Sequence, residues 1–199
     1  VIVFCSAAFA QTAVFGVPTA EIQQKGSLYI EADLFAHFDK FDRGGFRSFG
    51  PSVIYGVNKR VEAGINLYAT QDGTETTVEI EPNIKYRALD QDKFGVDVAV
   101  GAVAYVPIVR SADSKASAML YTVATRKFAS AKNLALTGGV YRVVGGTADM
   151  GTRTGILVGA QQPVTKRLTL MADWTSGKNR FGYSNAGFGY AVTSKQYLM

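Results

Sequence analysis

Apolar and polar residues alternate with a period of two along most of this chain. Between residues 28 and 38 every even-numbered position is apolar, and the odd-numbered positions carry Tyr29, Glu31, Asp33, Phe35 and His37. Successive side chains of a β-strand point to opposite faces, so this alternation predicts a strand with one apolar face. The same period returns at residues 61–70, 78–88, 96–106, 156–161 and 168–175, and less regular extended segments occupy 46–56, 117–128, 134–144 and 182–191.

We therefore predict about ten strands of roughly 9 to 13 residues, long enough to cross a bilayer at a tilt. Gln196–Met199 has the character of the beginning of an eleventh strand. The period never shifts to that of a helix over a useful window. No apolar run approaches the roughly 20 residues that a membrane-spanning helix needs, which argues against a helical membrane protein.

The connections between these strands alternate in length. Those at 57–60, 89–93, 129–133 and 164–167 are short and polar, whereas those at 40–45, 108–115, 145–151 and 176–180 are mostly longer. Short turns on one side and longer loops on the other are typical of outer-membrane barrels with an even number of strands. The prediction is an all-β, antiparallel, up-and-down transmembrane β-barrel over residues 26–199, with about twelve strands in a full protein of which this chain lacks both ends.

The first residues have the pattern of an export signal. Residues 1–10 form an apolar run that ends in Ala8-Phe9-Ala10, the A-x-A pattern of a signal-peptidase site. We expect a signal-peptide remnant here, cleaved near Ala10 and carrying away Cys5, the sole cysteine; a buried first strand is the alternative. Residues 11–25 show no clear period and are predicted to be a periplasmic lead-in segment.

Alternation alone does not say which face of a barrel is apolar. The export signal, a strand number above the eight of small soluble barrels, and simple Val/Ala/Leu/Ile faces all favour an apolar outer face in contact with lipid. The other parity then lines the lumen, where charges must meet water or partners. The predicted lumen-lining residues are Glu31, Asp33, Glu62, Glu79, Glu81, Lys85, Arg87, Asp97 and Asp173. The mixed signs at residues 79–87 could select solutes, or the charges could pair and close the lumen.

Aromatic residues gather near the predicted strand ends, as expected for side chains at the headgroup level of a bilayer. The predicted girdle consists of Phe38, Tyr86, Phe94, Trp174, Phe181 and Tyr183.

Composition and motifs indicate a protein that is not an enzyme. The net charge is +5 with a pI near 9.3, but the basic residues are scattered and form no stripe for nucleic acid. His37 is the only histidine; Asp33 shares its parity and Ser48 could lie across the hairpin, but no serine has the context of a nucleophile. No Cys/His metal cluster occurs, and no cofactor is expected.

The stretch from Leu168 to Asn179 carries a family resemblance. A strand ends in an acid–Trp pair, a Ser-Gly-Lys-Asn loop follows, and the next strand is rich in Gly and Tyr. This arrangement resembles the small outer-membrane barrels grouped with the MetA pathway of phenol degradation. The resemblance implies a channel of about twelve strands, with hydrophobic or aromatic compounds among its candidate solutes.

The resulting hypothesis is a monomeric barrel in the bacterial outer membrane, exported through the periplasm, inserted by the barrel-assembly machinery and passing small solutes. A barrel without transport, with a structural or adhesive role, is the alternative. An outer-membrane hydrolase is the third candidate and would require His37 to meet an activated serine.

Overall fold

The computed structural model describes residues 2–5, 12–37, 39–43, 45–73, 75–109, 115–148, 150–193 and 196–199. The predicted cleavage site at Ala8–Ala10 and the predicted girdle residue Phe38 lie outside these residues.

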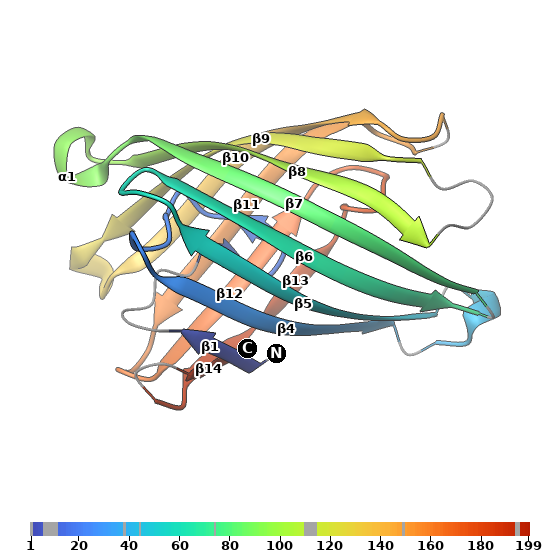
Figure 1. Cartoon of the computed structure of the whole chain (residues 1–199). Coiled ribbons are helices and arrows are strands. Elements are labelled where there is room, and N and C mark those ends of the chain that lie inside the picture. Colours follow the sequence, from blue (N-terminus) through green and yellow to red (C-terminus); the bar gives the residue numbers. More distant parts are fainter. Residues whose placement is uncertain are drawn as a thin grey trace.

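The fold is a long antiparallel meander of eleven strands, each paired with the next along the chain (Figure 1). The strands are β4 (Leu28–His37), β5 (Phe46–Gly56), β6 (Val61–Asp72), β7 (Glu75–Leu89), β8 (Asp97–Val109), β9 (Ser117–Phe128), β10 (Leu134–Gly145), β11 (Thr154–Pro163), β12 (Leu168–Thr175), β13 (Ser184–Ala191) and β14 (Gln196–Leu198).

The predicted all-β meander is confirmed. Ten strands and a short eleventh appear in the predicted order, and three of them, β5, β9 and β12, begin and end where the pattern places them. The turn after β7 differs, because it contains the short helix α1 (Gln91–Phe94). Asp90 caps this helix by accepting a hydrogen bond from the Asp92 backbone N–H, and Gly95 ends it with a φ of 75°. Among the described residues, no helix is long and apolar enough to cross a membrane.

The first strand, β1 (Ile2–Cys5), pairs in antiparallel fashion with both edge strands of the meander, β4 and β14. Because the meander has an odd number of strands, β4 and β14 run in the same direction, and a strand antiparallel to both fits between them. Of the segment predicted to be a signal remnant, the structure describes residues 2–5, which form this strand. Figure 1 shows the sheet curling so that its two edges approach each other beside β1.

The two faces of the curled sheet differ in polarity. Every strand of the meander exposes at least one large apolar side chain, whereas most buried charged and polar side chains lie on the opposite parity. On β4, Leu34 is 66% exposed and its neighbour Asp33 is 6% exposed. The exposed set includes, one per strand, Leu34, Phe49, Ile65, Ile84, Val100, Leu120, Val140, Ile156, Leu170, Phe188 and Leu198. The inner face also contains an apolar cluster that includes Val123, Tyr141 and Leu157.

Tyrosine rings and glycines on neighbouring strands pack together repeatedly. A Cβ atom at Gly101 would meet the ring of Tyr121, its direct partner in the β8–β9 ladder. Gly155 stands in the same relation to Tyr141. The pairs Gly50–Tyr68 and Gly189–Tyr197 repeat the arrangement. Each glycine leaves space for a ring to lie against the backbone, as glycine–aromatic pairs do in curved sheets.

Candidate functional site

Residues 12–25, here called the inner segment, lie inside the curve of the sheet. They begin with a small hairpin of β2 (Ala13–Val14) and β3 (Val17–Pro18). The segment hydrogen-bonds to Glu62 on β6 and to Asp173 on β12, strands far apart in the meander. One short segment can reach both only if the sheet encloses it, and Figure 1 shows its dark blue trace between the front and back strands.

The tip of the hairpin is held by Asp173. One carboxylate oxygen, Oδ2, accepts hydrogen bonds from the backbone N–H groups of Gly16 at 2.8 Å and Val17 at 2.9 Å. The other oxygen accepts from Asn185 Nδ2 at 2.7 Å. Phe15 takes a φ of 41° in this turn, and its ring lies over Gly187, where a Cβ would come within 3.0 Å of it. The wall thus provides both an acceptor and space for this turn.

A buried ion pair holds the rest of the inner segment. Lys85 Nζ lies 2.9 Å from Glu62 Oε1, and both residues are buried, each 3% exposed. Lys85 also donates to the carbonyl oxygens of Thr12 at 3.0 Å and Thr19 at 3.2 Å. Glu62 Oε2 accepts from the backbone N–H of Gln23 at 2.6 Å. Both charges are therefore compensated by a partner charge and by the backbone of the inner segment, which a buried pair needs to persist.

Further contacts tie the segment to β9. Thr125 Oγ1 accepts from the Ala20 backbone N–H at 2.9 Å and lies 2.8 Å from the Thr137 hydroxyl. Glu21 forms an ion pair with Lys127. The side chains of Val14, Val17 and Ala20 are fully buried, and Val17 and Ala20 pack on an apolar cluster of the inner wall.

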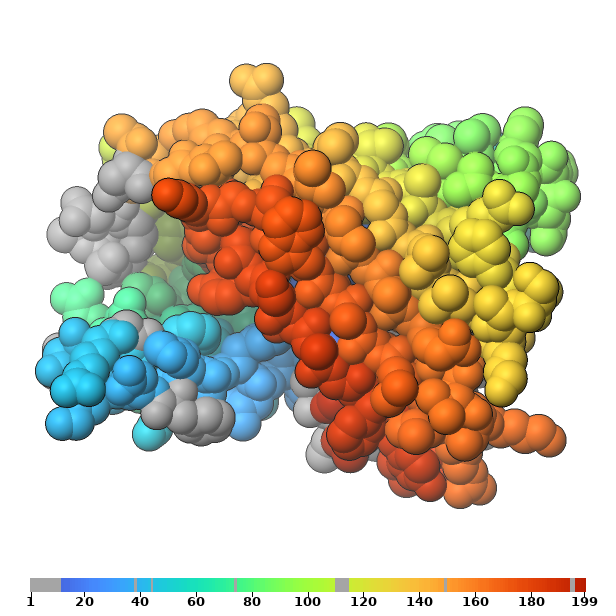
Figure 2. Space-filling view, turned by 180° about the vertical axis from the view of Figure 1, so that it is seen from behind, coloured from blue at the N-terminus to red at the C-terminus, as the bar shows by residue number. Residues whose placement is uncertain are grey.

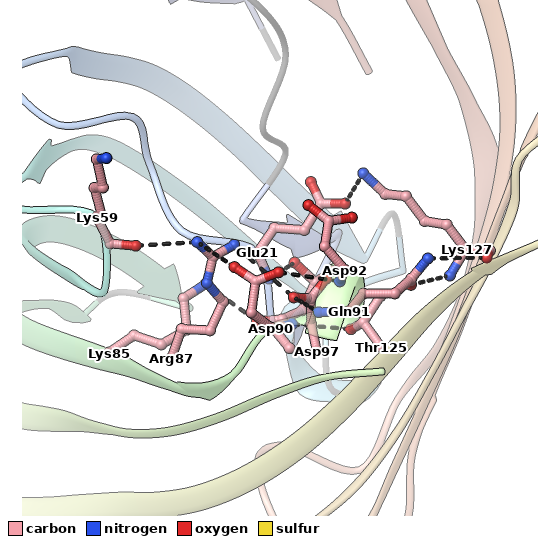
Figure 3. Close-up of polar contacts among 12 residues, drawn as sticks. Glu21, Lys59, Lys85, Arg87, Asp90, Gln91, Asp92, Asp97, Thr125 and Lys127 are labelled. Atoms are coloured by element: carbon pink, nitrogen blue, oxygen red, sulfur yellow. Dashed lines mark hydrogen bonds and ion pairs between the residues drawn. The ribbon is translucent and has the colours of Figure 1, made fainter. Parts of the chain in front are cut away.

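The inner wall continues in a polar network at the short-turn end, the end of the sheet formed by residues 57–60, 90–96, 129–133 and 164–167 (Figure 3). Arg87 lies 3.5 Å from Asp90 and 3.9 Å from Asp97, and it donates to the Lys59 carbonyl. Asp97 accepts from the Gln91 backbone N–H at 2.9 Å. The network joins β7, α1 and β8.

A second group of charges lies toward the loop end, the opposite end formed by the connections near residues 40–45, 73, 146–153 and 176–183. Arg180 pairs with Glu79 through two hydrogen bonds of 2.9 and 2.5 Å, and its guanidinium lies 4.9 Å from the centre of the Tyr105 ring. Burial alone would lower the pKa of Arg180, but the hydrogen bonds and charge of Glu79 hold that pKa above its ordinary value. Nearby, Tyr68 donates to Asp33 at 2.5 Å.

The predicted lumen residues fall into three groups. Glu62, Lys85 and Asp173 bind the inner segment; Arg87 and Asp97 lie at the short-turn end. The third group comprises Asp33, Glu79 and Glu81 on the loop side, where Glu81 accepts from Asn66 at 3.1 Å, with half-buried Glu31 beside Asp33 on β4.

Sequence reasoning missed the inner segment itself, together with Thr125 and Arg180. The segment's hairpin is too short to show a period. A threonine or a loop arginine becomes recognisable as a partner only once the sheet curls.

The predicted girdle residues divide as well. Tyr86, Phe94, Trp174 and Tyr183 are exposed. Phe181 departs from the prediction: its ring packs 5.0 Å from Tyr105, on the inner side. The loop after β12 turns inward there, because Arg180 beside it pairs with Glu79 across the interior.

The pair considered for hydrolysis is engaged in other contacts. The Ser48 hydroxyl lies 2.8 Å from that of Thr70, and the His37 ring lies 6.4 Å from that of Phe46. Within the described residues, no group of three or more His, Cys, Asp and Glu side chains could hold a metal ion.

The position of the inner segment predicts a specific cross-link. A Cβ at Gly159 would lie 3.6 Å from the Cβ of Val14, a separation suited to a disulfide. We expect Val14→Cys with Gly159→Cys, in a Cys5→Ser background, to oxidise readily in the folded protein, as detected by a mobility shift that reductant reverses. Gly138→Cys with Val14→Cys is the matched control, because Gly138 is exposed and has no atom within 4 Å of its Cβ position. Equal cross-linking of the two pairs would contradict the enclosed position.

The buried ion pair predicts an asymmetric pattern of stability. Lys85→Met leaves the Glu62 carboxylate buried without its partner, so the free energy of unfolding should fall by about 3–5 kcal/mol. Adding Glu62→Gln should recover a large part of this loss, because no uncompensated charge then remains. Denaturant unfolding of the two variants in detergent checks this, and a double variant no more stable than Lys85→Met would show that the pair is not the cause.

Comparison with known proteins leaves the chain without an assigned family: no family model, no curated protein and no solved structure matches it.

Proposed function

We propose that this chain forms the wall of a β-barrel in the bacterial outer membrane and that small solutes pass through its interior, with the inner segment controlling the passage. The observation that carries the proposal is the exposed apolar face, which extends over every strand of the meander. An apolar surface of this extent is unfavourable in water and favourable against lipid tails.

A membrane position also requires that no strand edge stays unpaired. Eleven strands leave two parallel edges, and a twelfth strand, in this structure β1, gives the even number that such barrels have. Export through the periplasm and insertion by the barrel-assembly machinery belong to the same proposal.

The polar interior supports passage of solutes, and the inner segment restricts it. On the loop side, Glu79, Glu81 and Arg180 present charges of both signs toward the inside. On the short-turn side, the inner segment spans the interior from β6 to β12. Solutes would therefore pass only when the segment shifts from its contacts with the wall. A barrel without transport is the second candidate, favoured by the number of hydrogen bonds that hold this segment in place.

Trp174 is the only tryptophan and reports on membrane contact. It is 46% exposed near the loop-end terminus of β12. We expect its fluorescence to be quenched by lipids brominated on their acyl chains, and more by bromines near the headgroup than by deep ones.

As a control, Trp174→Phe with Tyr141→Trp moves the sole indole to the inner face, where quenching should be lost. Tyr141 is 3% exposed and packs in the inner cluster. No quenching of Trp174 in vesicles that hold folded protein would rule out the membrane position.

Conductance tests the passage. Asp173→Ala with Thr125→Val removes three hydrogen bonds to the inner segment, which together hold it by about 3 kcal/mol. In planar bilayers this variant should open more often or more widely than the unaltered chain. The oxidised Val14→Cys/Gly159→Cys protein should conduct least and recover on reduction. If the unaltered chain, the Asp173→Ala/Thr125→Val variant and the reduced Val14→Cys/Gly159→Cys protein all fail to conduct in membranes where Trp174 is quenched, the barrel does not transport solutes.

A further inference from the structure

A cavity of about 800 Å³ opens at the short-turn end, between the inner segment and the wall formed by β4 and by β9 to β14. Its volume lies in the range of sites that hold small organic molecules. Much of its lining is apolar or aromatic, including Tyr29, Ala135, Pro163 and Ala191. Figure 2 shows the outer side of this wall, with the yellow, orange and red strands that carry the lining residues.

The charged residues of this lining are unbalanced in sign. Lys127, Lys132, Lys166 and Arg167 line the cavity, and Glu21 is the sole carboxylate among the described lining residues. Glu21 pairs with Lys127. Over the described part of the chain, no carboxylate comes within ion-pair distance of Lys132, Lys166 or Arg167. The cavity therefore combines an apolar body with a positive margin.

The acids on the opposite side of the same end are paired with a cation of their own. Asp90 and Asp97 lie around Arg87 on β7, α1 and β8, away from the cavity. Because these acids lie beside Arg87 and not beside the lysines of the cavity, they leave its positive margin without local neutralisation, and an anion is attracted there.

We infer that this cavity is a binding site for small organic anions with an apolar body, such as a carboxylate on a short hydrocarbon chain. The anion's charge meets Lys166 and Arg167 at the turn between β11 and β12, and its apolar part lies against Tyr29 and Ala135. The inference rests on the proposed transport function, since it names the class of solute that binds beside the inner segment before passage.

Glu21 gives the site a link to the inner segment. The Glu21 carboxylate forms an ion pair with Lys127. It therefore repels an anion in the cavity and competes with that anion for the Lys127 amine. A bound anion that draws Lys127 away weakens one of the contacts that hold the inner segment to β9. Binding and displacement of the segment are therefore coupled in the direction that opens the interior.

Isothermal titration calorimetry on the folded, full chain in detergent tests the site with hexanoate and hexanamide, which share shape but not charge. Hexanoate should bind at least about tenfold more tightly, and Lys166→Gln with Arg167→Gln should remove most of this preference. Lys115→Gln with Lys178→Gln is the charge-matched control at the loop end and should leave binding unchanged. Glu21→Gln should strengthen hexanoate binding by about threefold, a gain that misfolding does not produce.

Three results would overturn the inference: equal affinities for the acid and the amide, equal losses from the two double variants, or inorganic phosphate binding as tightly as hexanoate. The last result would show a charged surface without an apolar site. Absence of hexanoate binding in a protein that conducts overturns this inference alone. Binding without conductance in any variant keeps the site and removes transport.

Discussion

The period of two in an antiparallel sheet forces a choice on this chain. Because successive side chains alternate between faces, a sheet that curls must place one parity inside and the other outside. Here the apolar parity lies outside, so charged side chains from five strands, β4, β6, β7, β8 and β12, are brought into the interior. An interior of that composition is stable only if each charge has a partner or contacts water. The inner segment and the ion pairs of the wall provide such partners.

The inner segment provides a large part of that compensation. Its backbone N–H groups bind the carboxylates of Glu62 and Asp173, and its carbonyl oxygens bind the Lys85 amine. The segment is well suited to this role, because outside the two-residue strands β2 and β3 its backbone groups are not used in a ladder and would otherwise be buried without partners. Wall and segment therefore satisfy each other, and each would leave unpaired polar groups if the other were removed.

The parts of the fold that could be predicted are those encoded in the local sequence, either as alternation or as an extended segment between turns. The strands β5, β9 and β12 were found to the residue, and charges such as Glu62 and Asp173 could be assigned to the inner parity, since each depends only on neighbouring positions. The inner segment could not be placed, because its contacts join residues more than a hundred positions apart, as Gly16 does with Asp173. The inward position of Phe181 is of the same kind, since it follows from the pairing of Arg180 with Glu79 across the interior.

The same compensation explains why the two ends of the interior differ. Toward the loop end, Arg180 pairs with Glu79 and contributes a cation to a wall otherwise rich in Asp33, Glu79 and Glu81. At the short-turn end the cations outnumber the acids on the β9–β12 side, and Glu21 of the inner segment answers only one of them. An anion at the short-turn end is therefore attracted to the side of the interior where the inner segment meets β9. The inner segment is thus positioned beside the cations that have no carboxylate partner among the described residues.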